Sequence, residues 1–339
     1  MKLEGGRDQA LAGALRVRIR SKVRCLALVV FSLAIPAISN VSPASAALPT
    51  CEGRHPKTTL FSNQGRLESV IAGNGGRLFF AGVAPAPVGE PPASRLYRVD
   101  RPGAPVAVLL QGPANAGGLA WSERRLLWGY GNGLANGSVG DTSPTAGLLS
   151  VDPVTGNSFV VSSTLGMANG IARGPDGTIF ASNSLALKLD RITPSGSTFI
   201  TLNGFASLDS ANGLAVSRSG KYIFAAQTFV TPSRISLIEV GNPGRITAYF
   251  TSPEASMVVF DGLTRDNRGN LYVAALGLGQ IWKINPERKA CVLASGLTNP
   301  SSVAVGTAPK GFGQGSLFVV GFGGEVTEVK NALTATVPD

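Results

Sequence analysis

The feature that most constrains the fold is a pattern that occurs six times along the chain. Its clearest copy, residues 260–276, reads FDGLTRDNRGNLYVAAL: an aspartate and a glycine, a short strand, a turn and a second apolar strand. Two strands joined by a glycine-rich turn indicate a β-hairpin. The polar positions that open the copies are 68, 117, 169, 212, 261 and 301. A spacing of about 40–50 residues between strand-only units is typical of a β-propeller.

A second hairpin completes most copies of the pattern. In the second copy, the apolar runs 148–151 and 159–161 flank a turn that contains Asp152, Pro153 and Gly156. These are residues that favour turns. Six copies with four strands each predict an all-β fold, a six-bladed β-propeller with four antiparallel strands per blade. No segment has a convincing helical period.

The ring is expected to close by pairing of the N- and C-terminal segments. Residues 57–61, KTTLF, precede the first copy as residues 290–294, ACVLA, precede the sixth. They therefore correspond to the outermost strand of a blade, and the natural candidate is the last blade, residues 301–339. Pairing the chain ends would remove a free sheet edge. The C-terminal segment 333–337 competes for the same outer position.

The N-terminal residues 1–46 are predicted to be a cleaved signal peptide, which leaves 47–339 as one propeller domain. A basic region from Arg16 to Arg24 precedes an apolar core, residues 25–38, and Ala44-Ser45-Ala46 forms a cleavage site. The apolar core is short of the roughly 20 residues that a membrane span needs. We expect a secreted or periplasmic protein with no stable membrane span after cleavage; an uncleaved anchor is the alternative.

Charge and histidine content narrow the function classes. The formal net charge is +10, but residues 1–46 carry half of it. No basic cluster with interleaved aromatic residues follows, so no nucleic-acid partner is expected. The single histidine, His55, lies before the first copy, which disfavours a Ser-His-Asp triad and excludes His-rich zinc chemistry. Nothing in the sequence indicates an oligomeric state.

Two cysteines remain once the signal peptide is removed, Cys51 and Cys291. An exported chain with two cysteines can form one disulfide bond. Cys291 falls in the outer strand of the fifth blade, and Cys51 precedes the strand that we assign to the neighbouring sixth blade. A bond between them would tie down the N-terminus. The alternative is a pair of free thiols.

The six opening positions are predicted to form a ring at one mouth of the central channel, because the innermost strand of each blade lines that channel. The ring consists of Glu68, Gly117, Asn169, Asn212, Asp261 and Ser301. Its carboxylate, amide and hydroxyl oxygens are the hard donors that Ca²⁺ prefers and that Mg²⁺, Mn²⁺ or Zn²⁺ also accept. Taken singly, Asn-Gly and Asp-Gly are ordinary turn formers. Their shared register favours a metal site.

This ring, with the motifs ANGLAVSRSGKYIFAAQT and DGLTRDNRGNLYVA, resembles the SMP-30/gluconolactonase/LRE-like family of six-bladed propellers over about residues 60–330. The resemblance implies a divalent cation held by Glu68, Asn212 and Asp261. It implies that Asn169 contacts the metal site or the substrate, and that Asp261 is a general base. Asp261 and Asn169 are thus the candidate catalytic residues.

Two positions depart from the family pattern. Sugar-lactone members often have arginine two residues before the position of Asn169, where this chain has Met167. The first-blade glutamate usually precedes Gly-Pro, whereas Glu68 precedes Ser69-Val70. The latter context is similar to strictosidine-synthase-like and NHL-type propellers, some of which only bind.

The resemblance therefore implies a secreted, metal-dependent hydrolase of a lactone or small ester. A bound cation would polarise the carbonyl group of the ester. The alternative is a non-catalytic binding propeller that recognises a protein or carbohydrate partner, because this fold alone does not determine function.

Overall fold

The computed structural model describes residues 47–339 except 74, 85–92, 140–141 and 314. The predicted signal peptide, residues 1–46, lies outside the described residues. Within the described ranges, no helix is long and apolar enough to cross a membrane.

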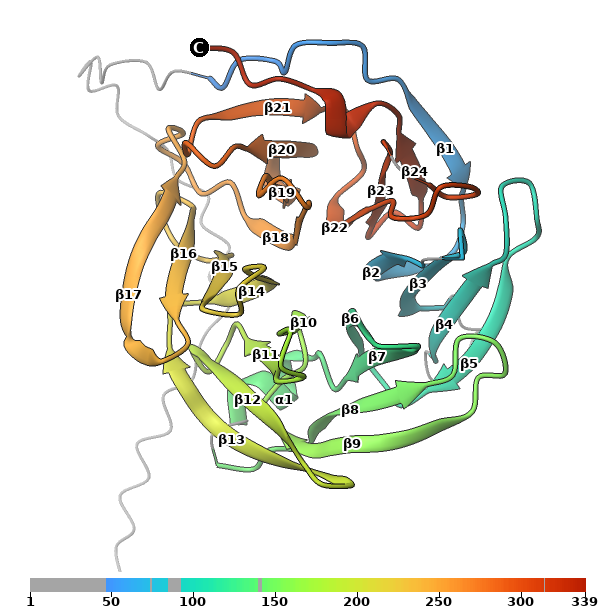
Figure 1. Cartoon of the computed structure of the whole chain (residues 1–339), viewed down its shortest axis with the longest axis vertical. Coiled ribbons are helices and arrows are strands. Elements are labelled where there is room, and N and C mark those ends of the chain that lie inside the picture. Colours follow the sequence, from blue (N-terminus) through green and yellow to red (C-terminus); the bar gives the residue numbers. More distant parts are fainter. Residues whose placement is uncertain (1–46, 74, 85–92, 140–141, 314) are drawn as a thin grey trace, which may run out of the picture. The chain divides into compact units, whose positions relative to one another are not determined.

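Six four-stranded antiparallel sheets surround a central channel, as Figure 1 shows. This confirms the predicted six-bladed propeller with four strands per blade. The strands are β1 (Lys57–Phe61), β2 (Arg66–Ala72), β3 (Leu78–Val83), β4 (Ser94–Val99), β5 (Ala107–Gly112), β6 (Ala116–Ser122), β7 (Arg125–Tyr130), β8 (Ala146–Val151), β9 (Ser158–Leu165), β10 (Ile171–Arg173), β11 (Ile179–Asn183), β12 (Lys188–Ser195), β13 (Thr198–Ser207), β14 (Ala211–Val216), β15 (Tyr222–Gln227), β16 (Arg234–Glu239), β17 (Asn242–Thr251), β18 (Phe260–Arg265), β19 (Leu271–Ala275), β20 (Gln280–Ile284), β21 (Ala290–Ala294), β22 (Pro300–Val305), β23 (Leu317–Gly321) and β24 (Val326–Val329).

Five blades are simple meanders that run outwards from the channel in chain order, for example β2-β3-β4-β5. The sixth blade has the order β22-β23-β24-β1, so the N-terminal strand is its outermost strand. Lys57 in β1 pairs with Val329 in β24. The competing segment, 333–337, instead contributes to the 3₁₀ helix η2 (Ala332–Thr334) and to a bridge between Thr336 and Glu52.

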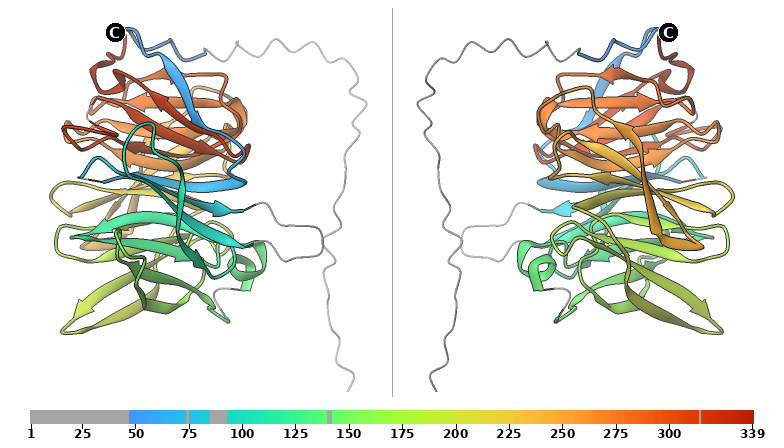
Figure 2. Two further views of the ribbon diagram at one scale, coloured as in Figure 1. Left: turned by 90° about the vertical axis from the view of Figure 1, so that its right-hand side faces the viewer. Right: turned by 90° about the vertical axis from the view of Figure 1, so that its left-hand side faces the viewer.

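One short α-helix, α1 (Leu134–Val139), interrupts the all-β pattern between β7 and β8. It lies on one face of the disc, as the edge-on views of Figure 2 show. A further 3₁₀ helix, η1 (Leu276–Leu278), follows β19. The sequence did not predict α1, because six residues make fewer than two turns and display no helical period.

Apolar side chains of neighbouring sheets form the core between the blades. Between the fourth and fifth blades, the ring of Trp282 packs edge-on against Phe260 and Phe250, with centroids 5.3 and 6.4 Å apart. All three side chains are buried. Such edge-to-face packing is a favourable arrangement of aromatic rings, and it fixes each blade against the next.

The predicted disulfide bond joins Cys51 to Cys291, with their Cα atoms 5.0 Å apart. Backbone hydrogen bonds reinforce it: the Cys51 N–H donates to the Val292 carbonyl at 3.0 Å, and the Val292 N–H donates to the Pro49 carbonyl at 2.8 Å. The segment before β1 is therefore attached to β21 of the fifth blade, while β1 itself completes the sixth. The two attachments close the ring across a blade boundary.

Removing the disulfide bond is expected to destabilise the protein without changing its fold. Replacing both Cys51 and Cys291 by alanine should lower the free energy of unfolding by about 2–5 kcal/mol, because the bond restricts the unfolded chain. Denaturant unfolding of the oxidised protein and the double variant measures this difference. Dithiothreitol should destabilise the natural chain and leave the variant unaffected; equal stability of the two proteins would contradict the prediction.

A candidate metal and catalytic site at the channel mouth

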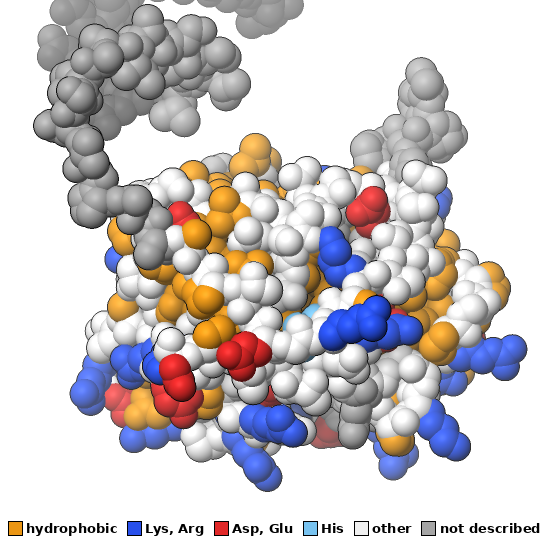
Figure 3. Space-filling model, turned by 90° about the horizontal axis from the view of Figure 1, so that it is seen from above, with side chains coloured by type: hydrophobic (Ala, Val, Ile, Leu, Met, Phe, Trp, Pro, Cys, Tyr) orange, Lys and Arg blue, Asp and Glu red, His pale blue; other side chains and the backbone are white. Residues whose placement is uncertain are grey.

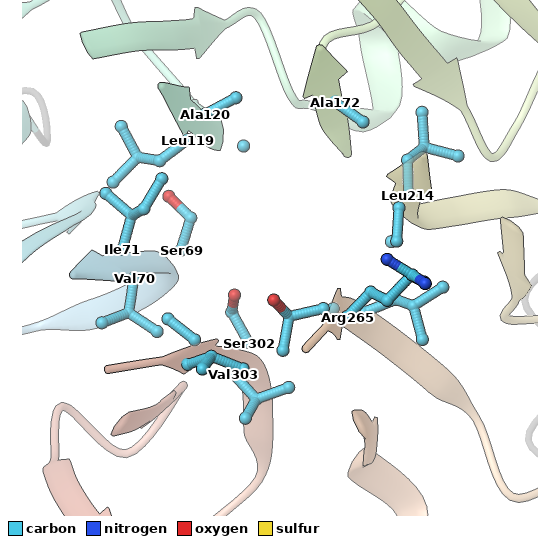
Figure 4. Close-up of a pocket in the computed structure, with 18 of the residues that line it drawn as sticks. Ser69, Val70, Ile71, Leu119, Ala120, Ala172, Leu214, Arg265, Ser302 and Val303 are labelled. Atoms are coloured by element: carbon cyan, nitrogen blue, oxygen red, sulfur yellow. The ribbon is translucent and has the colours of Figure 1, made fainter. Parts of the chain in front are cut away.

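The central channel contains a cavity of about 590 Å³ lined by the innermost strand of every blade. Glu68, Asn169, Asn212 and Asp261 all line it. Each stands at or near the start of its inner strand, so the four share the mouth at which those strands begin. Residues further along the strands form the apolar wall of the channel, including Val70, Leu119, Leu214 and Val303 in Figure 4.

A β-bulge aims most ring residues into the channel. In five of the inner-strand pairings, the register shifts around the ring position, and the shifts fall between Leu67 and Ser69, Ala116 and Leu119, Ala211 and Leu214, Phe260 and Leu263, and Pro300 and Ser302. A bulge inserts an extra residue and re-aims a side chain. The polar residue that opens each copy is thus a residue outside the regular ladder.

The glycine that follows Asn169, Asn212 and Asp261 has a different purpose from a turn glycine. A Cβ atom on Gly213 would lie 2.4 Å from the Asp261 carbonyl oxygen, and one on Gly170 would lie 2.2 Å from the Asn212 carbonyl oxygen. Neither glycine has a positive φ. The Asn-Gly and Asp-Gly pairs are therefore not turns. They mark places where the inner strands of neighbouring blades approach too closely for any side chain.

The amide group of Asn212 has a fixed orientation. The Thr228 hydroxyl donates its proton to the Phe260 carbonyl at 2.8 Å, so its oxygen is left to accept a hydrogen bond. It accepts from Asn212 Nδ2 at 2.9 Å. Because the nitrogen is held by Thr228, the amide oxygen of Asn212 is the atom left for a cation.

Asn169 is held in a similar way in the third blade. Its Nδ2 donates to Ser184 Oγ at 3.2 Å, and Ser184 in turn donates to the sulfur of Met167 at 3.8 Å. The amide oxygen of Asn169 is again the free end. Met167, which stands where sugar-lactone members have arginine, is buried and accepts the hydrogen bond of Ser184.

Glu68 is held by Asn132, which follows β7. Asn132 Nδ2 donates to Glu68 Oε1 at 2.8 Å, whereas the buried Asn132 Oδ1 has no hydrogen-bond partner among the described residues. Burial raises the pKa of Glu68 to about 7, against the lowering effects of Arg66 and Asn132. An unpartnered buried carbonyl oxygen is unfavourable unless a cation or another donor satisfies it.

Asp261 is buried and lies close to Glu68. Burial raises the pKa of the Asp261 carboxyl well above its usual value, and the nearby Glu68 charge raises it further, whereas hydrogen bonding from Asn212 and the positive charge of Arg66 lower it. The two carboxyl groups therefore share one mouth of the channel. Two buried carboxylates repel one another unless a proton or a cation lies between them.

The donor set fits a hard divalent cation. In the described part of the chain, no three His, Cys, Asp or Glu side chains come together. Two carboxylates with the amide oxygens of Asn169 and Asn212 would supply the oxygen ligands that Ca²⁺ takes. The hydroxyl of the ring position Ser301 donates its proton to the Leu67 carbonyl at 2.9 Å, which ties the sixth blade to the first.

Arginines gather at the opposite mouth. Where the inner strands end, Arg173, Arg265 and Arg268 line the cavity together with Asp266. Arg173 pairs with Glu123 at 3.8 Å. His55 does not line the cavity and contacts the backbone carbonyls of Glu52 and Asn331.

The sequence analysis missed the residues that hold the ring: Asn132, Ser184 and Thr228, with Arg66 as the nearby positive charge. The first three share one structural position: Ser184 and Thr228 directly follow the second strand of their blades, and Asn132 is the second residue after it. Aligning the six copies on that strand end would have brought them together. Their contacts cross between strands and blades, however, so only the folded chain shows what each one holds.

Comparisons with known proteins show a shared fold. The chain matches no protein-family model and no curated protein by sequence. It is similar in structure to a gluconolactonase from Xanthomonas campestris, with a TM-score of 0.64, 18% identity and 85% of this chain covering 96% of that one. It is also similar to the calcium-binding protein regucalcin from Agrobacterium tumefaciens, with a TM-score of 0.58 and 15% identity; the match covers 84% of this chain and 95% of that one. A chain of the nidogen/laminin complex matches with a TM-score of 0.54 and 16% identity, over 72% of this chain and 90% of that one.

The close approach of the inner strands predicts an unequal effect of two glycine substitutions. Gly213→Ala places a methyl group against backbone atoms of the fifth blade, whereas a Cβ on Gly241, in the turn between β16 and β17, meets nothing within 4 Å. We expect Gly213→Ala to lower the free energy of unfolding by about 1–3 kcal/mol or more, and Gly241→Ala to have little effect. Urea unfolding of both variants tests this, and equal effects would contradict it.

The paired carboxyl groups predict opposite effects of one substitution with and without a cation. Asp261→Asn should raise the melting temperature of the metal-free protein, because it removes like-charge repulsion. Ca²⁺ at a hundredfold excess over its Kd should raise the melting temperature of the natural chain by roughly 5–10 °C, and that of the variant hardly at all.

The matched control for this experiment is Asp209→Asn, which removes an exposed carboxylate that pairs with Arg234. It should keep the full response to Ca²⁺. Thermal unfolding in chelator, Ca²⁺, Mg²⁺, Mn²⁺ and Zn²⁺ also ranks the cations. A natural chain whose melting temperature responds to none of them has no cation site at this mouth.

Proposed function

We propose that this protein is a metal-dependent hydrolase of the SMP-30/gluconolactonase type that opens a lactone or small ester. The observation that carries the proposal is the meeting of two buried carboxyl groups and two oriented amides at one channel mouth. The shared fold with a gluconolactonase and with a calcium-binding regucalcin supports the same class.

Four residues have distinct roles in the proposal. Glu68, Asn212 and Asp261 hold the cation, and Asn169 supplies a further oxygen to the cation or orients the substrate. When bound, a divalent cation would polarise the carbonyl group and stabilise the negative charge that develops on its oxygen. Asn132 and Thr228 keep Glu68 and Asn212 in place through the hydrogen bonds described above.

Asp261 is the proposed general base. It accepts a proton from the water that attacks the carbonyl carbon, and the proton passes to the ring oxygen as the acyl carbon–oxygen bond breaks. The product is a hydroxy acid. A carboxyl group whose pKa is raised by burial and by Glu68 is a better base near neutral pH than an exposed aspartate. Arg66 is the nearby positive charge that could attract the carboxylate product.

The proposal includes export of the mature chain. The Cys51–Cys291 bond supports an oxidising compartment, in keeping with the signal peptide predicted at residues 1–46. Mass spectrometry of the protein isolated from its natural host would identify the mature N-terminus and the state of both cysteines.

Hydrolysis of a panel of lactones and aryl esters tests the activity. We expect turnover that chelation abolishes and that added cation restores. Asp261→Asn should lower kcat/KM at least about 10³-fold, because it removes both the general base and a cation ligand. Asp209→Asn is the matched control and should retain activity. If no substrate is hydrolysed, or if turnover survives both chelation and Asp261→Asn, the chain is better described as a binding propeller for a protein or carbohydrate.

A further inference from the structure

A set of exposed apolar side chains occupies the same face of the disc as the Glu68 mouth. We define this apolar rim as Leu134, Val139, Leu187, Phe229, Met257 and Leu278. All six lie in connections that follow the second strand of a blade or precede the first strand of the next, and these connections open on the face where the inner strands begin. Their exposed fractions range from 40% for Leu278 to 78% for Leu134.

The rim is close to the site because the chain joins the two directly. Phe229 is bonded to Thr228, whose hydroxyl holds Asn212. Leu134 stands two residues after Asn132, which holds Glu68. Leu187 stands three residues after Ser184, which holds Asn169. With consecutive Cα atoms about 3.8 Å apart, the backbone of these three residues lies within about 12 Å of the backbone of the groups that position the ring.

The opposite face has a different character. Among the described residues, the other exposed large apolar side chains lie on the outer strands β5, β9 and β13, apart from Val154 in a turn of the second blade. The loops of that face instead carry charged side chains of both signs, and Lys, Arg, Asp and Glu side chains are seen along the lower edge of Figure 3. The apolar side chains around the Glu68 mouth are therefore a property of one face, not of the surface as a whole.

The layer beneath α1 is also apolar. A Cβ on Gly137 of α1 would lie 2.9 Å from both the sulfur of Met167 and Cδ1 of Leu185, so α1 packs directly on these two side chains. Exposed apolar groups next to a concave polar site are typical of ligand-binding surfaces.

We propose that the apolar rim binds a hydrocarbon tail of the substrate, so that the preferred substrates are lactones or esters with an extended alkyl chain. This inference rests on the proposed function, since the reacting carbonyl would lie at the ring of Glu68 and Asp261. The ring determines which bond is broken, and the rim selects the part of the molecule that does not react. The channel wall below the ring is also apolar, but its residues lie deeper along the inner strands than the ring itself.

The test compares γ-butyrolactone with γ-dodecalactone, which share the reacting ring and differ by an octyl tail. We expect the longer lactone to have a kcat/KM higher by at least tenfold, since each fully buried methylene contributes up to about fourfold. In the double variant Leu134→Ser/Phe229→Ser, the ratio of the two kcat/KM values should fall at least tenfold. The matched control, Ile200→Ser/Leu202→Ser on β13, replaces two exposed apolar side chains on an outer strand and should keep the ratio.

A binding measurement separates this inference from the proposed activity. The uncharged fluorophore pyrene, displaced by decanol, reports on the rim without any hydrolysis. Weaker decanol binding in the rim variant than in the β13 control supports the rim even if no lactone is turned over. If the ratio of kcat/KM values and decanol binding are both unchanged in the rim variant, the proposal that the rim binds a hydrocarbon tail is wrong. Turnover of γ-butyrolactone that depends on Asp261 would still support the proposed function.

A membrane surface is the other apolar partner that this experiment must distinguish. Flotation with phosphatidylcholine vesicles provides the comparison. If the rim variant loses vesicle binding but keeps its preference for γ-dodecalactone, the rim serves attachment to lipid and the inference about the substrate is wrong. If the preference is lost and vesicle binding is absent in all proteins, the inference stands.

Discussion

The structure depends on how closely six inner strands can approach one another around a narrow channel. At Gly170, Gly213 and Gly262, the backbone of the next blade lies where a side chain would begin. Hydroxyl groups complete the contact at other boundaries, as when Ser69 donates to the Gly117 carbonyl at 2.8 Å. This close approach brings residues from separate blades within range of one another. Without it, Glu68 and Asp261, which lie almost 200 residues apart in the chain, could not influence each other's pKa.

The same contacts determine which atoms the mouth presents. Thr228 illustrates this, since its one proton is used by the Phe260 carbonyl, and its oxygen therefore selects the nitrogen end of the Asn212 amide. Ser184 orients Asn169 in the same way: it donates its proton to the sulfur of Met167, and its oxygen accepts from the nitrogen of the Asn169 amide. An amide can present either end to a ligand, and these hydroxyls decide that it presents oxygen. If the proposed cation binds at this mouth, residues that would not touch it orient its amide ligands.

Much of the architecture could be predicted from the sequence because it repeats. Each blade carries its own copy of the strand pattern, so six weak signals support one another, and Glu68, Asn169, Asn212 and Asp261 occur at equivalent positions. What could not be predicted depends on contacts between copies. The sequence left two candidates for the outer strand of the sixth blade, and only the pairing of Lys57 with Val329 distinguishes them. Likewise, Asn132 looks like an ordinary loop residue until its contact with Glu68 is seen.

The electrostatics of the mouth depend on the apolar character of its surroundings. Burial is the largest influence on both carboxyl groups, and it raises the pKa of Glu68 to about 7 even though Arg66 and Asn132 oppose it. Apolar side chains that line the channel beyond the ring, such as Val70 and Leu214, help to exclude the water that would otherwise stabilise two negative charges. The site therefore requires a positive partner, either a proton or a cation. An apolar setting also strengthens the interaction with that partner, because the local dielectric constant is lower than in water. In the proposed function, the buried ring would hold the cation and the exposed rim would bind the hydrocarbon tail, so the two proposals rest on different parts of one face.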